Sequence, residues 1–260
     1  MQAVLYVGHG SRVAAGAVEA VQFIESTKVF IDCPIQEICF LELTAPNVGE
    51  GIQKCVEQGA TKIAVVPILL LTAHHANEDI PREIEKGKMK YPNVMFTYGE
   101  AFGIHPKMID SLLDRVIEQQ VSIAKNAQVL LVGRGSSDPA VKHDLTVIAQ
   151  LLSDKYPFSR VDVCFLYGAT PSFDEALLQL QKTVPQQVFI IPYLLFTGIL
   201  MKGIAKRLKE VSSSNQQLIL CESLGYHPNI QEVLVERVRE LLEQENVCLQ
   251  STSSALAYRY

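Results

Sequence analysis

The chain has 260 residues, a formal net charge of −5, 48% hydrophobic residues and 20% charged residues. This length and hydrophobic content are typical of one large or two ordinary globular domains and exclude a disordered protein. The acidic balance, without a stripe of Lys and Arg, argues against nucleic acid as a partner. The longest apolar run, residues 63–71, is too short to span a bilayer, so we expect no membrane association.

The N-terminus and the cysteines indicate a cytoplasmic protein. The first ten residues, MQAVLYVGHG, have no basic region and enter a strand pattern at once, unlike a signal peptide. The cysteines show no Cys-x-x-Cys spacing and lie at positions 33, 39, 55, 164, 221 and 248. We interpret them as small buried hydrophobic residues in a reducing compartment.

Strand and helix patterns alternate along the first half of the chain. Strands are predicted at residues 3–7, 36–41, 62–70 and 94–98. Helices are predicted after the first strand, over residues 46–59, past Pro81 towards Lys90, and from Pro106 to about Glu118. The apolar run from residue 63 fits a strand that is buried on both faces of a parallel sheet. This alternation predicts right-handed βαβ units.

The second half repeats this plan. Pro67 and Pro192 lie in matching apolar segments 125 residues apart (192 − 67), and residues 8–12 match residues 133–137 at the same offset. Residues 38–42 match residues 163–167 in the same register, with a cysteine second in each segment. Residues 103–106 and 225–228, both Gly-x-His-Pro, correspond at an offset of 122 (225 − 103). Matches in the same order predict an internal duplication.

We therefore predict an α/β protein of two duplicated, doubly wound domains with parallel sheets and a ligand cleft between them. The first domain comprises residues 1–123 and the second residues 124–250, with the boundary in the polar residues 122–127. Residues 251–260 form a tail without a clear signal, which we expect to be frayed.

The duplication distinguishes scaffold from chemistry, because residues kept in both copies are most simply structural. By this test Gly8 and Gly10 are turn glycines with counterparts at 133 and 135. His105 and His227 precede proline at a helix start in both copies, which favours a structural or local binding role. His143 lies in a charged helical stretch and is expected at the surface.

Three reactive residues of the first copy are absent from the second: His9 becomes Arg134, Glu42 becomes Tyr167 and His75 becomes Leu200. All three follow the carboxyl ends of strands, where they can converge at the topological switch point of the sheet. Two imidazoles and a carboxylate predict a site for a divalent first-row metal with positions open for another ligand. Each residue alone has an ordinary structural explanation, but their joint loss favours a functional site. Adjacent helical residues point about 100° apart, so His74 and His75 are not expected to bind one metal together.

The two glycine-rich turns resemble anion-binding loops at helix N-termini. As a phosphate loop the pattern is weak, because no Gly-Lys-Ser/Thr follows, and it suits carboxylates equally well. We expect the two turns to lie on opposite sides of the interdomain cleft and to bind an anionic ligand there. The residues expected to bind it are Ser11, Arg12, Arg134, Ser136 and Ser137. Surface salt bridges are the competing explanation for the two arginines.

These motifs together resemble the class II tetrapyrrole chelatases. The resemblance rests on Val-Gly-His-Gly-Ser-Arg at residues 7–12, Phe-Leu-Glu-Leu at 40–43, and Pro-Ile-Leu-Leu-Leu-Thr-Ala-His-His followed by Asp-Ile-Pro over 67–81. It covers residues 2–242 and is most similar to the long, two-domain members of siroheme biosynthesis. It implies a chelatase fold with a tetrapyrrole bound between the domains. By position His9 and His75 correspond to the metal-handling histidines and Glu42 to the associated acid.

The resemblance implies that the chain inserts Fe²⁺ into sirohydrochlorin, with the metal as substrate and no further cofactor. His9 and His75 would hold the ion, and Glu42 could bind it, accept a pyrrole proton or orient a histidine. Three alternatives stay open: Co²⁺ insertion for cobalamin, a metal or tetrapyrrole carrier without turnover, and a metallohydrolase. We expect a monomer.

Overall fold

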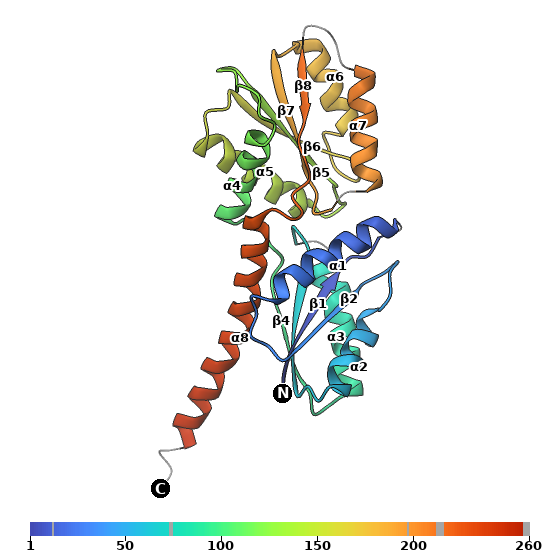
Figure 1. Cartoon of the computed structure of the whole chain (residues 1–260), viewed down its shortest axis with the longest axis vertical. Coiled ribbons are helices and arrows are strands. Elements are labelled where there is room, and N and C mark those ends of the chain that lie inside the picture. The colour runs from blue at the N-terminus through green and yellow to red at the C-terminus, as the bar shows by residue number, and fades with distance from the viewer. Residues whose placement is uncertain (12, 73–74, 197, 212–215, 257–260) are drawn as a thin grey trace.

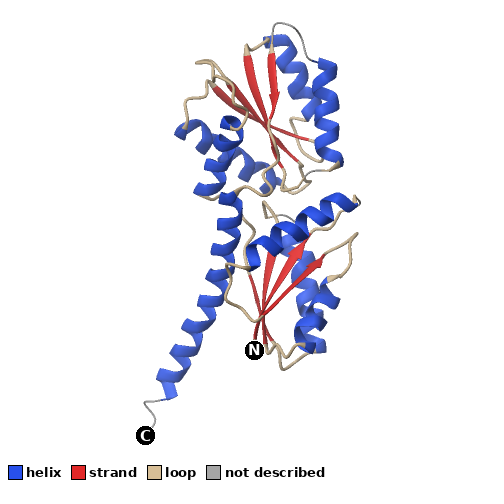
Figure 2. Cartoon of the chain, viewed as in Figure 1, coloured by secondary structure: helices blue, strands red, loops and turns tan. Residues whose placement is uncertain are grey.

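Two four-stranded parallel sheets, each flanked by helices, form the framework of the protein (Figures 1 and 2). The computed structural model describes residues 1–11, 13–72, 75–196, 198–211 and 216–256, with side chains except those of residues 75 and 244–256. The strand orders are β2-β1-β3-β4 and β6-β5-β7-β8, with every pair parallel. The predicted α/β class with two duplicated domains is confirmed.

The elements follow one plan in both halves. The first half contains β1 (Gln2–Gly8), α1 (Ala14–Lys28), β2 (Ile35–Phe40), α2 (Val48–Glu57), β3 (Lys62–Ile68), a π-helix η1 (His75–Asp79), α3 (Ile80–Lys90), β4 (Met95–Tyr98) and α4 (Pro106–Ile117). The second half contains β5 (Gln128–Gly133), α5 (Pro139–Lys155), β6 (Arg160–Phe165), α6 (Phe173–Thr183), β7 (Gln187–Tyr193), α7 (Ile199–Val211), β8 (Gln217–Leu220) and α8 (Pro228–Leu256).

The central strands are buried on both faces, as their apolar runs predict. Residues 63–68 of β3 and all of β7 are buried, and β1 and β5 are nearly so. On β1, Tyr6 and its even-numbered neighbours point into one hydrophobic cluster, while Leu5 and its odd-numbered neighbours point into another. Each sheet is therefore the middle layer of a sandwich, which forces polar function to the strand ends.

The fourth helices are exchanged between the halves. α4 of the first half packs against α5 and β7, whereas α8 of the second half packs against β3 and α1 (Figure 1). One continuous hydrophobic cluster consequently runs through both domains; it includes Phe23, Met108, Leu112, Leu145 and Val233. The predicted boundary between residues 123 and 124 describes the repeat along the sequence and stays a prediction, since each sandwich in space takes a helix from the other half.

A pair of arginines fastens the exchanged helices. Arg115 of α4 donates from Nη2 to the carbonyl oxygens of Leu224 (3.2 Å) and Gly225 (3.0 Å), just before α8. Arg237 of α8 donates from Nη2 to the carbonyl oxygen of Phe102 (3.1 Å), just before α4. The two arginines are 122 residues apart (237 − 115), so the clamp is duplicated with the fold. Charge-assisted hydrogen bonds of this kind hold the connectors at fixed positions.

One element differs from the sequence prediction. The helix after β3 begins with the π-helical turn η1, which apolar spacing does not indicate. α8 extends to Leu256, and the fraying expected of residues 251–260 stays a prediction. Within the part of the chain that the structure describes, none of the helices combines the length and apolarity of a membrane span.

Candidate functional site

The two candidate residues His9 and Glu42 lie in neighbouring loops that the backbone locks together. β1 lies between β2 and β3, with Gly8 paired to Phe40 of β2 and to Ile68 of β3. Beyond the strands the pairing continues, because the N–H of Glu42 donates to the carbonyl oxygen of His9 at 3.2 Å. The two side chains therefore emerge side by side at the carboxyl edge of the sheet.

Gly10 allows this close approach of the loops. Its φ is +95°, and a Cβ built there would lie 1.8 Å from the carbonyl oxygen of Glu42. Only glycine fits such a position without moving one of the loops. Thr44 adds a second tie, because its Oγ1 accepts a hydrogen bond from the N–H of Ser11 at 3.1 Å. Sequence reasoning passed over Thr44, although the duplication gives a signal, since its counterpart is Ala169.

The spacing of His9 and Glu42 suits a shared metal ion. His9 Nδ1 and Glu42 Oε1 are 3.6 Å apart, and their side chains are 27% and 50% exposed. This distance is too long for a normal hydrogen bond. Two ligand atoms that are each about 2.1 Å from one ion, at a tetrahedral angle, lie about 3.4 Å apart. The pair can therefore bind one ion between them with little movement, while solvent and a larger ligand keep access.

The third candidate, His75, is placed by its backbone alone. It is the first residue of η1, which follows β3, so it lies beyond the strand next to β1 in the sheet. The side chain of His75, together with His74 and Arg12, lies outside the described residues. Among the residues that are described, no group of three or more His, Cys, Asp or Glu could hold a metal. The joint action of His9, Glu42 and His75 thus stays a prediction.

The second half keeps the scaffold of this site and lacks its chemistry. The N–H of Tyr167 donates to the carbonyl oxygen of Arg134 at 2.9 Å, as Glu42 does to His9. Gly135, with φ +85°, would place a Cβ 1.8 Å from the carbonyl oxygen of Tyr167. Tyr167 and Leu200 line a shallow pocket of about 290 Å³. At the positions equivalent to Glu42 and His75, the second half therefore has a phenol and an alkyl side chain.

The predicted anion-binding loops have a common local structure. Ser11 Oγ accepts a hydrogen bond from the N–H of Val13, and Ser136 Oγ accepts one from the N–H of Asp138, both at 3.1 Å. Each hydroxyl keeps its proton available for another acceptor. Arg134 and Ser137 are exposed. The carboxyl edges of the two sheets face each other (Figure 1), so these loops lie on opposite sides of the junction between the domains. Ligand binding by them stays a prediction.

His105 and His227 have structural roles, in agreement with their preservation in both copies. His105 Nδ1 accepts a hydrogen bond from the N–H of Lys107, and His227 Nδ1 accepts one from the N–H of Asn229, both at 3.2 Å. Both therefore cap the helices that their Pro residues begin. Burial lowers the pKa of His227, with Arg115 adding to the effect. His143 is exposed on α5.

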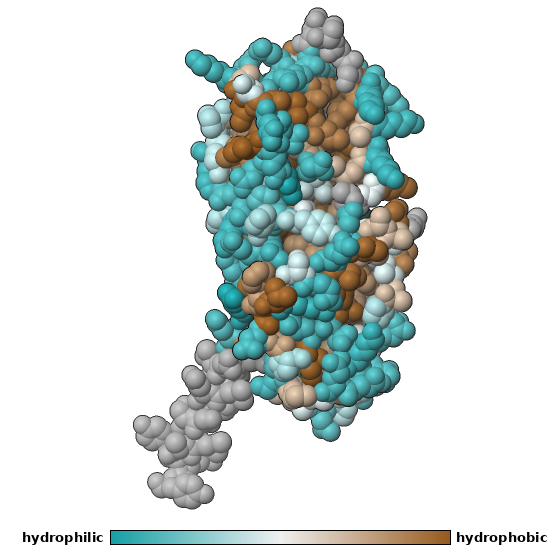
Figure 3. All heavy atoms as spheres, viewed as in Figure 1, coloured by the Kyte–Doolittle hydropathy of each residue, from teal (hydrophilic) through white to brown (hydrophobic). Residues whose placement is uncertain are grey.

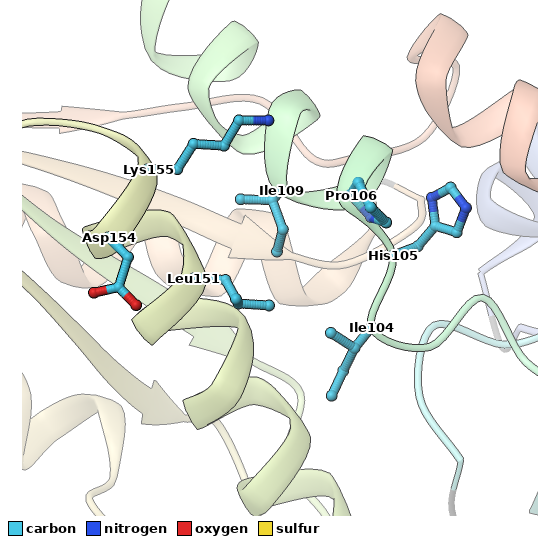
Figure 4. A pocket seen from close by; sticks show the side chains of 7 residues that line it. All are labelled: Ile104, His105, Pro106, Ile109, Leu151, Asp154 and Lys155. Atoms are coloured by element: carbon cyan, nitrogen blue, oxygen red, sulfur yellow. The ribbon is translucent and has the colours of Figure 1, made fainter.

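Two other features of the described residues, the buried thiols of Cys55 and Cys221 and a groove beside α4, lie outside this site. Burial raises the pKa of Cys55 and Cys221 to about 12, which keeps both thiols protonated. A groove of about 470 Å³ lies between α4 and α5 (Figure 4) and contains none of the predicted site residues. Its lining is mostly apolar, and Lys155 at its edge is paired with Asp110.

Comparisons with known proteins match the chain along nearly its whole length. The model of the CbiX family matches residues 3–119 and 128–241. Sirohydrochlorin ferrochelatase from Priestia megaterium is 51% identical over 245 residues, which cover 94% of this chain and 92% of that protein. Sirohydrochlorin cobaltochelatase from the same organism is 38% identical over 251 residues, covering 94% and 81%. The structure of SirB from Bacillus subtilis with Fe³⁺ superposes with a TM-score of 0.87 at 44% identity, covering 94% of this chain and 97% of that one.

Proposed function

The chain belongs to the CbiX family, and on this premise we propose that it is a sirohydrochlorin ferrochelatase, which inserts Fe²⁺ into sirohydrochlorin and releases two protons. The observation that carries the proposal is the His9–Glu42 pair, whose 3.6 Å spacing suits a shared divalent ion at an open edge of the sheet. The 51% identity to a ferrochelatase over most of both chains supports iron as the metal.

The proposed mechanism divides the work between an imidazole and a carboxylate. Neutral His9, with His75 after the adjacent strand, holds Fe²⁺ until the ring nitrogens replace these ligands. The ring loses two pyrrole protons as it takes up the dication, so the net charge of the macrocycle and the oxidation state of the iron do not change. Glu42 is half exposed and lies beside His9, so it can accept the two protons one after the other and pass each to solvent. The iron is substrate, and the mechanism requires no redox cofactor.

The second half provides the opposite side of the site. Its carboxyl edge faces that of the first half (Figure 1) and presents Arg134, Ser136 and Ser137 for the carboxylates of the macrocycle. The corresponding residues of the first half are Ser11 and Arg12. Because every residue in this scheme belongs to one chain, we propose that the monomer is active.

Cobalt insertion is the second candidate. A cobaltochelatase is 38% identical over 94% of this chain. Imidazole and carboxylate ligands separate Fe²⁺ from Co²⁺ only weakly, so availability of the ion can decide between them.

An anaerobic absorbance assay with sirohydrochlorin tests the proposal, with Fe²⁺ and Co²⁺ offered separately against controls without protein. We expect Fe²⁺ to enter faster with the protein, and the acceleration to be lost in His9→Ala and in His75→Ala. His143→Ala, which removes an exposed histidine of α5, is the matched control and should insert iron at the parental rate. Pigment binding without faster entry of either metal would favour a carrier instead, and acceleration of Co²⁺ alone would favour the cobalt branch.

A further inference from the structure

Leu43 is an exposed hydrophobic residue directly beside the candidate site. Hydrophobic residues reach the surface on both domains (Figure 3), so exposure alone indicates nothing. Leu43 is 52% exposed and belongs to none of the hydrophobic clusters that the described residues form. The fold therefore gains little from its side chain.

The backbone of Leu43 is unfavourable for a leucine. Its φ is +63°, in the left-handed region that side chains with a Cβ rarely adopt. The N–H of Thr44 donates to the carbonyl oxygen of Glu42 at 2.7 Å, which closes a three-residue turn around Leu43. A γ-turn with positive φ at its centre is the rare and strained variety. Leucine at this position thus costs the fold some stability.

The second copy has glycine at the equivalent position. Gly168 lies 125 residues after Leu43 (168 − 43) and has the same φ of +63°. Glycine adopts this φ without strain, and an added Cβ at Gly168 would lie 3.0 Å from the backbone of Ser136. The first copy, which alone carries His9 and Glu42, has leucine instead. The leucine side chain is therefore associated with the half that carries the chemistry, and the fold does not account for it.

The position of Leu43 suits contact with a flat ligand above the metal. It follows Glu42, whose carboxylate is 3.6 Å from His9, at the edge that faces the second domain (Figure 1). Tyr167 and Ile199 on the facing edge are 62% and 69% exposed. A tetrapyrrole has carboxylates at its rim and an apolar conjugated face around its central nitrogens. An apolar side chain next to the metal ligands matches that face.

We propose that Leu43 is a substrate-binding residue whose side chain packs against the apolar face of the macrocycle and sets its height above the metal. The inference rests on the proposed function and adds a contact to it. A leucine that is half exposed before binding gains about half of its full burial, which corresponds to about three- to tenfold tighter binding of the macrocycle.

The test combines three substitutions at Leu43 with one matched control. Leu43→Gly removes both the side chain and the backbone strain. Leu43→Asn introduces a polar side chain on a residue that tolerates left-handed backbone. Leu43→Met retains an apolar side chain. Val184→Gly is the control, because Val184 has φ +42° and is 47% exposed at the end of α6, away from the site. For each variant we would measure the Kd for metal-free sirohydrochlorin by fluorescence, Co²⁺ binding without pigment, and the urea midpoint of unfolding.

The expected result is a change in pigment binding without a loss of stability. Leu43→Gly and Leu43→Asn should raise the Kd for the pigment about three- to tenfold, while Leu43→Met stays near the parental value. Co²⁺ binding should be unchanged, and the urea midpoint of Leu43→Gly should equal or exceed that of the parent, as in Val184→Gly. If the glycine and asparagine variants bind the pigment with the parental Kd, or if Leu43→Gly has a lower urea midpoint, the role of Leu43 is overturned. The proposed function would then still stand. A parent protein that binds no sirohydrochlorin would overturn the proposed function as well.

Discussion

The duplicated turn glycines give the sharpest test of how the fold positions the site. Gly10 and Gly135 occupy equivalent turns, but only Gly10 lies against the loop that carries Glu42. We predict that Gly10→Ala and Gly135→Ala lower the free energy of unfolding by similar amounts, while only Gly10→Ala weakens metal binding. The two copies thus separate the cost to the fold from the cost to function.

The magnitude follows from the geometry of the two turns. At both positions the added Cβ would lie 1.8 Å from a carbonyl oxygen, whereas ordinary contact begins near 3.4 Å, so the loops must separate by about 1.6 Å (3.4 − 1.8). Forced separation and left-handed backbone together should cost about 2–4 kcal/mol. A shift of that size is larger than the displacement of about 0.5 Å that two metal ligands can undergo without losing their geometry. We therefore expect metal affinity to fall about 10- to 100-fold.

The assays are urea unfolding and Co²⁺ titration of the three proteins, followed by insertion kinetics. Gly103→Ala serves as a further control, because Gly103 has φ +67° but its nearest neighbour to an added Cβ is 3.8 Å away. Its loss of unfolding free energy should reflect only the left-handed backbone conformation, because no loop is displaced. Equal loss of metal affinity in Gly10→Ala and Gly135→Ala, or parental affinity in Gly10→Ala, would refute the reasoning.

The other predictions concern the acid, a helix cap and the domain clamp. Glu42→Gln should lower kcat about 100- to 1,000-fold in the insertion assay, and leave the free energy of unfolding within about 0.5 kcal/mol because its side chain is half exposed. His227 has a lowered pKa, so the unfolded chain takes up its proton first and stability should fall as the pH drops below about 6.5. His227→Asn keeps a capping side chain but has no titrating group, so the free energy of unfolding in urea should depend less on pH between about pH 7 and 5. The same pH dependence as in the parent would contradict this. Arg115→Met should lower unfolding stability by about 2–3 kcal/mol in urea, and a loss below about 1 kcal/mol would show that the clamp contributes little.

The sequence determined the fold class and the division between scaffold and chemistry. Apolar runs with period neither 2 nor 3.6, such as that of β3, indicate strands buried on both faces, and the structure confirms this. The repeat at an offset of 125 located equivalent turns, and the hydrogen bonds of His9 with Glu42 and of Arg134 with Tyr167 follow the same pattern. Such features are local in the chain or repeated in it, so they can be read without coordinates.

The distances within the site could not be predicted in this way. Spacing along the chain places His9 and Glu42 after neighbouring strands, but the 3.6 Å between their side chains depends on the turn at Gly10 and on the tie to Thr44. The strained turn at Leu43 was missed for the same reason. Its signal, glycine in one copy and leucine in the other, has meaning only when φ is known.

Only the tertiary structure decided the exchange of α4 and α8. Both helices carry a sequence signal for their start, Gly-x-His-Pro, but this signal is the same for both and does not say which sheet each helix covers. The choice depends on the path of the connectors and on the clamps that Arg115 and Arg237 make with the other half. Local propensity and hydrophobic pattern act over a few turns of chain, whereas this choice depends on contacts between residues more than 100 positions apart. The sequence therefore determined what each half is, and packing decided how the halves are joined.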